Sequence, residues 1–399
     1  MVKIVKIGFA ALIGFCCNLV SANALDFSGE IDTSFFFYRE KPKFVEQDSD
    51  KFQSELAVVF HLNGEVFTKW DLDSTFFLRH NPDAQKDIWG DIRELRFSGY
   101  KSNSSISAGV LTEYWGSLEA NNPVDIINAR DFIQDYEGDI KLGQPGLAYS
   151  RFEGNHQLDT FILPYARERA LPEGRDRYRF NSFDYASAQF EKNRYLPSLA
   201  LRYKYTHEQG RLAVSQYRGY TRSPEFIAET SPDSQEIELI PKYQLINQTG
   251  LELEWLKAGA IFKAELIYQS GGPDSFFGTG TGVEREFPNI LNSSMTFTPF
   301  FEVYYDNRNE RAPITAFDND LYLGARVLFN DINDSKIQTN MLWDWESHAY
   351  FYELDASRRI GNDWLVSTAV TIPVNADDDP ALSSFTEDER IMFKLRYHF

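Results

Sequence analysis

The chain of 399 residues contains 40 basic and 59 acidic residues, so its net charge is −19, and 15% of its residues are aromatic. This acidic balance excludes a protein built around a basic nucleic-acid-binding face. Beyond residue 24 no apolar run approaches the roughly 18 residues of a transmembrane helix. The two cysteines, Cys16 and Cys17, lie near the N-terminus, so the remainder of the chain cannot contain a disulfide or a thiolate metal site.

The N-terminus has the pattern of an export signal. Lys3 and Lys6 precede an apolar stretch, 7–20, and an Ala-Asn-Ala triplet of the kind that signal peptidase cleaves ends at residue 24. We therefore predict a signal peptide over 1–24 and a single barrel domain over 25–399.

Past the signal, segments of about ten residues alternate apolar and polar side chains, which places the two sets on opposite faces of a β-strand. The pattern predicts an all-β fold, a transmembrane antiparallel up-and-down β-barrel with one face toward lipid and the other toward a wet lumen. A β-sandwich produces a similar alternation and is the alternative. The residues expected on the lumen wall are Lys263, Glu265, Arg326, Lys336, Glu353, Lys394 and Arg396.

Turn residues divide the chain into about 18 strands, and about 16 is the alternative count. The predicted strands begin near positions 26, 52, 66, 89, 105, 142, 156, 197, 212, 242, 260, 280, 296, 320, 336, 349, 364 and 390. Short periplasmic turns are expected at 63–64, 101–104, 154–155, 207–210, 257–259, 292–295, 331–334 and 361–363. Long outer loops are expected at 39–51, 81–88, 117–140, 166–196, 223–239, 271–279, 306–319 and 374–389. The Gly-Thr-Gly-Thr-Gly run at 278–282 is expected at a bend where a strand begins.

The last nine residues of the chain alternate, with an apolar set of Ile391, Phe393, Leu395, Tyr397 and Phe399, and only Met392 on the other face is not polar. A strand with one wholly apolar face suits a barrel whose last strand pairs with its first inside a membrane. An ordinary amphipathic edge strand is the alternative.

The third outer loop, 117–140, is less polar than a surface loop should be, because Val124, Ile126, Ile127 and Phe132 need burial. We expect it to fold into the lumen, where its charged residues would form a constriction. Those residues are Glu119, Asp125, Arg130, Asp131, Asp135, Glu137 and Asp139.

The fourth outer loop is rich in arginine. An acidic loop facing such a cluster would set a transverse field across a narrow pore. The alternative is that both loops are solvated, with the arginines contacting lipopolysaccharide phosphates. The arginines are Arg167, Arg169, Arg175, Arg177 and Arg179.

Several of these features resemble known families. The ending, with Phe393, Leu395, Tyr397 and Phe399, resembles the C-terminal assembly signal of bacterial outer-membrane proteins, which implies the barrel-assembly machinery as a partner. A third loop folded inward on a barrel that ends in Phe resembles the general and substrate-specific porins of Gram-negative bacteria.

Shorter motifs add to the likeness. Trp115-Gly116, followed by Asn122-Pro123 and Asp125, resembles a segment of several porin-like families, and the segments 304–331 and 356–359 are similar to uncharacterised proteins of this kind. The resemblance implies location in the Gram-negative outer membrane, contact with lipid and lipopolysaccharide, passive transport and, as for general porins, a homotrimer.

Motifs for catalysis are lacking: the sequence contains no Gly-x-Ser-x-Gly elbow, no His-Glu-x-x-His and no phosphate-binding loop. Its six histidines show no metal-ligand spacing. We expect no catalytic residue, metal or cofactor, apart from divalent cations that acidic outer loops could bind. The sequence therefore predicts a porin or substrate-preferring channel for small hydrophilic solutes. The alternatives are a structural or adhesive barrel that acts through its outer loops and an outer-membrane enzyme.

Overall fold

A computed structural model describes residues 25–67, 69–135, 137–231, 236–309 and 311–399. The predicted signal peptide, 1–24, lies outside the described residues. Among the residues that are described, no helix is long and apolar enough to cross a membrane.

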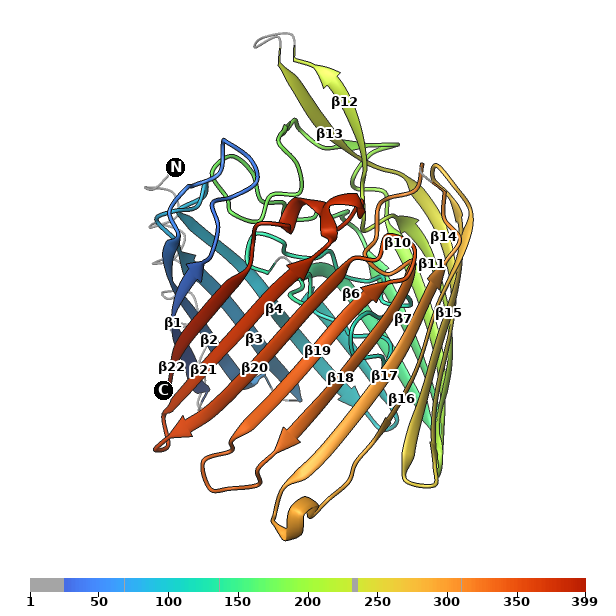
Figure 1. Ribbon diagram of the computed structural model, residues 1–399. Helices are drawn as coiled ribbons and strands as arrows, with labels where there is room; N and C mark the ends of the chain where they lie inside the picture. The colour runs from blue at the N-terminus through green and yellow to red at the C-terminus, as the bar shows by residue number, and fades with distance from the viewer. Residues whose placement is uncertain (1–24, 68, 136, 232–235, 310) are drawn as a thin grey trace.

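One antiparallel sheet of 18 strands forms the body of the molecule, as predicted (Figure 1). Each barrel strand pairs with its neighbours along the chain, so the topology is up-and-down. The barrel strands are β1 (Asp26–Tyr38), β2 (Phe52–Phe67), β3 (Trp70–His80), β4 (Ile88–Lys101), β5 (Ser104–Leu111), β6 (Gln144–Glu153), β7 (His156–Leu163), β10 (Ser198–His207), β11 (Gly210–Tyr220), β14 (Leu245–Lys257), β15 (Ala260–Gly271), β16 (Phe276–Arg285), β17 (Thr296–Asp306), β18 (Asn319–Leu328), β19 (Lys336–Asp344), β20 (Tyr350–Ile360), β21 (Trp364–Val374) and β22 (Arg390–His398).

The sheet closes on itself where β1 meets β22. These two strands are antiparallel, with Phe35 opposite Phe393. The closure extends past the strand end, because the backbones of Gly29 and Phe399 exchange two hydrogen bonds of 2.9 and 3.0 Å. Closure gives every barrel strand two neighbours, which removes the unpaired edges that an open sheet would present to lipid.

The two faces of the strands differ as the alternation predicts. On β10, Leu199 and Leu201 are 52% and 48% exposed, whereas the intervening Ala200 is 1% exposed. On β22 the side chain of Phe393 is also exposed, as is that of Phe399 just beyond the strand. Large apolar side chains that face outward on a closed barrel form a lipid-facing surface. The fold is thus a transmembrane β-barrel.

One predicted turn is wrong. The Asn63-Gly64 step was expected to form a hairpin, but both residues lie within β2, and Asn63 pairs with Asp73 of β3. The chain reverses between Phe67 and Trp70, where Lys69 has a φ of 70°. A register shift between Glu65 and Phe67 marks a β-bulge just beyond Gly64 (φ 146°), so the Asn-Gly signal belongs to a strand irregularity and not to a turn.

Other boundaries differ in smaller ways. The turn expected at 292–295 is a longer connection, 286–295, that includes the 3₁₀ helix η1 (Ile290–Asn292). The prediction missed a ninth outer connection, 345–349, because it is short. The Gly-Thr-Gly-Thr-Gly run lies inside β16 and not at a bend before it.

The outer end carries additional structure. Two predicted loops, 166–196 and 223–239, contribute short strands to a separate four-stranded sheet. The hairpin of β12 (Glu225–Thr230) and β13 (Ile237–Tyr243) projects beyond the barrel rim (Figure 1). The last outer connection contains the 3₁₀ helices η2 (Ala376–Asp378) and η3 (Ser383–Phe385). The strands of the small sheet are β8 (Asp184–Tyr185), β9 (Gln189–Phe190), β12 (Glu225–Thr230) and β13 (Ile237–Tyr243).

Candidate functional site

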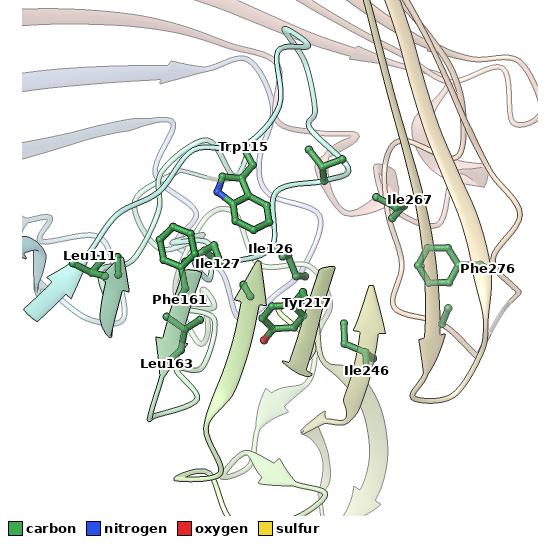
Figure 2. Close-up of a cluster of buried hydrophobic side chains, with 14 residues drawn as sticks. Leu111, Trp115, Ile126, Ile127, Phe161, Leu163, Tyr217, Ile246, Ile267 and Phe276 are labelled. Atoms are coloured by element: carbon green, nitrogen blue, oxygen red, sulfur yellow. The ribbon is translucent and has the colours of Figure 1, made fainter. Parts of the chain in front are cut away.

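The connection between β5 and β6, residues 112–143, lies inside the barrel, and we call it loop L3. Its apolar side chains are buried against inward-facing residues of the wall (Figure 2). Val124 and Ile127 are fully buried, and Trp115 packs against Phe161 of β7 at 5.9 Å between ring centroids. Burial of these side chains accounts for the unusual apolar content of the loop.

Three glutamates on the wall hold the backbone of L3. Glu252 of β14, Glu265 of β15 and Glu302 of β17 all point inward, and each accepts hydrogen bonds from backbone N–H groups of the loop. Such charge-assisted bonds are stronger than neutral ones. The bonds join Gly116 N to Glu252 Oε2 (3.1 Å), Ser117 N to Glu265 Oε1 (2.7 Å), Glu119 N to Glu302 Oε1 (2.7 Å) and Ala120 N to Glu302 Oε2 (3.0 Å).

Glycines make room for this close approach. Gly116 has a φ of +101°, and a Cβ atom there would lie 2.5 Å from Glu265 Oε1. On the wall, a Cβ atom at Gly280 would lie 2.5 Å from the side chain of Leu118, and one at Gly282 would lie 3.3 Å from it. The glycines of the β16 run therefore leave the space that Leu118 occupies.

Ion pairs fix the second half of L3. Asp131 is fully buried, accepts a hydrogen bond from Trp89 Nε1 (2.9 Å) and pairs with Arg93 of β4 (2.5 Å). Asp125 pairs with Lys141, which lies within the same loop. In both pairs the charges lie opposite each other and away from solvent, so the pairs restrain this half of the loop.

Two cavities flank L3 inside the barrel. The smaller, of about 340 Å³, lies between the loop and strands that include β1, β2 and β22. The larger, of about 740 Å³, lies beneath the outer loops. Glu137 and Asp139 line both cavities, so this part of L3 lies at the boundary between them. Glu353 and Asp355 of β20 also line both.

The acids of L3 at the boundary between the two cavities have raised pKa values. Burial, together with the nearby Asp135 and Glu137, raises the pKa of Asp139 to about 6. Burial, followed by repulsion from Glu353 and Asp135, raises the pKa of Glu137 well above its usual value. Asp135 itself accepts the backbone N–H group of Asp139 at 2.7 Å. The boundary is therefore an acidic surface whose charge changes near neutral pH.

The predicted acids of L3 have different roles. Glu119 lines the larger cavity and pairs with Arg326 of β18, and Asp125 lines it while pairing with Lys141. Asp135 lines the smaller cavity. Asp131, in contrast, is inaccessible to solutes because it is buried beside Arg93.

The structure corrects the expected cluster of arginines, because most of them stabilise outer loops. Arg167 pairs with Asp91 of β4, and Arg177 with Asp388 at 2.5 Å. Arg179 donates to carbonyl groups of its own loop, such as that of Gly174 at 2.8 Å. Arg175 donates to the carbonyl group of Ala84 at 3.0 Å and lines neither cavity.

Two of the five arginines do reach a cavity. Arg169 lines the larger one, and Arg177 lines the smaller one. Sequence reasoning missed Arg222 and Arg308, which also line the larger cavity, because each follows a strand as a single cation without a surrounding motif.

The predicted wall residues lie on inward-facing positions. Glu265 is 1% exposed beneath L3, and Lys263 pairs with Glu284 of β16 at 3.4 Å. Arg396 forms a two-point pair with Asp32 of β1 (2.7 and 2.8 Å), which ties the closing strands together. Lys394 lines the smaller cavity. Lys336 lies opposite Ser357 of β20.

No protein-family model matches this chain, and no curated protein matches its sequence. Solved structures do match it. The chain superposes on a BenF-like porin from Pseudomonas fluorescens Pf-5 with a TM-score of 0.56 and 8% identity, covering 94% of this chain and 98% of that one. For Acinetobacter baumannii OccAB3 the TM-score is 0.54 with 10% identity, and the coverage is 94% and 99%.

A third structure, Pseudomonas aeruginosa OpdQ, gives a TM-score of 0.51 with 11% identity, covering 94% of this chain and 97% of that one. The fold is that of an outer-membrane porin. At these identities the likeness extends to the architecture of the barrel, whereas the residues that line the cavities belong to this chain alone.

Proposed function

We propose that the protein is an outer-membrane porin or substrate-preferring channel for the passive diffusion of small hydrophilic solutes. The observation that carries the proposal is the pair of cavities that flank L3 inside a closed barrel. A barrel of this size encloses an aqueous lumen, and a loop anchored within it narrows that lumen. The fold shared with porins supports the same conclusion.

The acids at the boundary between the cavities form the proposed constriction. Glu137, Asp139, Glu353 and Asp355 give this part of the lumen a negative surface, and rings of acidic side chains favour cations. The opposing positive charge of the transverse field comes from Arg169 and Arg130, which line the larger cavity.

We also propose where the channel is located and how it assembles. The apolar outer face would lie in the outer membrane of a Gram-negative bacterium, inserted by the barrel-assembly machinery, with lipopolysaccharide around the acidic outer loops. Assembly as a homotrimer is also part of the proposal, because general porins of this architecture usually form one.

Conductance in planar bilayers tests the function. Purified, folded protein is expected to give discrete conductance steps in KCl and to allow liposome swelling with small sugars, amino acids and organic acids. Heat-unfolded protein is the control. If folded protein inserts but gives neither conductance nor swelling, the barrel is closed, and the structural or adhesive alternative replaces the channel.

A further inference from the structure

Arg222 is a buried cation that faces the larger cavity. It follows β11, is 5% exposed, and its guanidinium group lies over the Tyr217 ring at 5.6 Å. Its Nε atom donates to the carbonyl group of Ile126 in L3 at 2.9 Å. Among the described residues, its two terminal nitrogens, Nη1 and Nη2, have no hydrogen-bond partner.

Arg169 reaches the same cavity from the loop after β7. Its Nη2 atom donates a hydrogen bond to Ser223 Oγ at 2.5 Å, and Ser223 directly follows Arg222 in the chain. The guanidinium group of Arg169 lies over the Phe132 ring at 4.7 Å. Burial, and then repulsion from the nearby Arg130, lowers the pKa of Arg169 to about 10, so the side chain remains protonated at neutral pH.

Neither arginine has a carboxylate partner within 4.0 Å in the part of the chain that the structure describes. Arg308, on the same cavity, shows the usual arrangement, because it forms a two-point pair with Asp306 (2.9 and 2.6 Å). A buried charge without a partner is costly, and this chain has an excess of acids from which to supply one. The missing counter-charge at Arg169 and Arg222 therefore points to an anion from outside the chain.

We propose that Arg169 and Arg222 bind the carboxylate group of an organic acid that enters the larger cavity. The two terminal nitrogens of Arg222 form a planar fork that matches the two oxygens of a carboxylate. Ile126, Ile267 and Phe276 line the same cavity and provide an apolar surface for the remainder of the solute (Figure 2). The site deepens the proposed channel function and rests on it for the route by which the solute arrives.

Binding is measured separately from transport. Saturation-transfer NMR on the detergent-solubilised barrel compares butanoate, its neutral analogue butanamide, and inorganic phosphate as a competitor. Butanoate is expected to bind and butanamide to bind at least about tenfold more weakly, because charge-assisted hydrogen bonds carry the interaction. Phosphate is expected to displace butanoate poorly, because it has no apolar part to contact Ile126, Ile267 and Phe276. Equal binding of butanamide, or equal affinity for phosphate, would overturn the assignment to a carboxylate.

Variants locate the site. Arg222→Gln and Arg169→Gln are each expected to lower butanoate affinity about tenfold. Arg175→Gln removes the same charge from the same outer loops without lining the cavity, so it should bind as the parent does. If Arg222→Gln disturbs L3 and does not fold, the butanoate affinity of Arg169→Gln alone tests the site. Unchanged affinity in a folded variant refutes the site.

Conductance in KCl distinguishes the two proposals. A barrel that conducts KCl but does not bind butanoate keeps the channel function and loses this inference. A barrel that binds butanoate but does not conduct keeps the binding site and loses the channel.

Discussion

Ser117 of L3 donates its backbone N–H group to Glu265 Oε1 on β15 at 2.7 Å, and the same oxygen lies within 3.4 Å of the Leu118 N–H group. One wall carboxylate thus accepts hydrogen bonds from two successive backbone N–H groups. Glu302 of β17 accepts hydrogen bonds from the next two, those of Glu119 and Ala120. The position of the loop therefore depends on acids located far from it in the sequence.

Loosening this attachment should change the pore. Glu302→Ala removes both oxygens that hold Glu119 and Ala120, at a cost of about 1.5–3 kcal/mol for each charge-assisted bond. We expect noisier and larger single-channel currents, because L3 gains mobility. Glu254→Ala on β14, which pairs with Arg211 away from the loop, is the control. Identical current noise in the two variants would show that Glu302 does not restrain L3.

Removing the loop tests the constriction directly. Deletion of residues 121–136 takes out the apolar part of L3 that fills the lumen. We expect a severalfold increase in single-channel conductance, because the two cavities would merge. Heat-modifiable migration on gels verifies that the variant folds. A folded deletion variant with the parental conductance would place the ion path outside the influence of L3.

Selectivity should depend on pH through Asp139. Its pKa is raised to about 6, so the carboxyl group is mainly ionised at pH 7.5 and mainly protonated at pH 5. Cation preference, measured as the reversal potential in a KCl gradient, should therefore fall as the pH is lowered through 6. Asp139→Asn should begin with a weaker preference and show a smaller change over this range. A variant with the parental pH profile would assign the titration to another group.

Cysteine labelling tests the register of the wall, since the chain has no cysteine beyond residue 24. Asp355 lines both cavities, whereas Leu354 occupies the opposite face of β20. Cys at position 355 should react with a small water-soluble maleimide in liposomes, and Cys at 354 should be protected by lipid. The reverse order of rates would mean that the strand is shifted by one residue. Position 265 is unsuitable because L3 covers it.

The closing strand should be needed for assembly. Phe393→Lys with Leu395→Lys places two charges toward lipid, at about 2–4 kcal/mol for each site near the midplane. We expect loss of the folded, heat-modifiable band from outer-membrane fractions, and the same loss on deletion of Phe399. Lys394→Glu, on the lumen face, is the control and should fold. A normal folded band in the double variant would contradict the lipid-facing assignment of β22.

Much of the barrel was predictable from the sequence because strands with one lipid face and one wet face repeat every second residue. The strand starts at 26, 52, 156, 260, 296, 336, 364 and 390 agree with the structure. The turn predicted at Asn63-Gly64 was wrong, because the same dipeptide suits a bulge within a long strand. Local sequence cannot distinguish a turn from a bulge when the strands continue on both sides.

The site was less predictable. The apolar content of L3 indicated burial. The wall glutamates that hold the loop could not be identified from the sequence, because the backbone N–H groups that they bind carry no sequence signal. The arginines from 167 to 179 lie in an irregular loop, so neighbours in sequence point in different directions. Arg167 turns to Asp91 of β4, and Arg177 to Asp388 near the end of the chain. Proximity in sequence therefore gave a false impression of one cationic surface.

The backbone exchange between Gly29 and Phe399 has a consequence for assembly. It joins opposite ends of the described chain, so the cylinder stays open along one seam until the final strand arrives. An open seam presents two rows of unpaired peptide groups, each able to capture another chain. Because contacts between distant segments form slowly, we expect closure of this seam to be a late step in the assembly of the barrel, and the seam to need shielding from other chains until then.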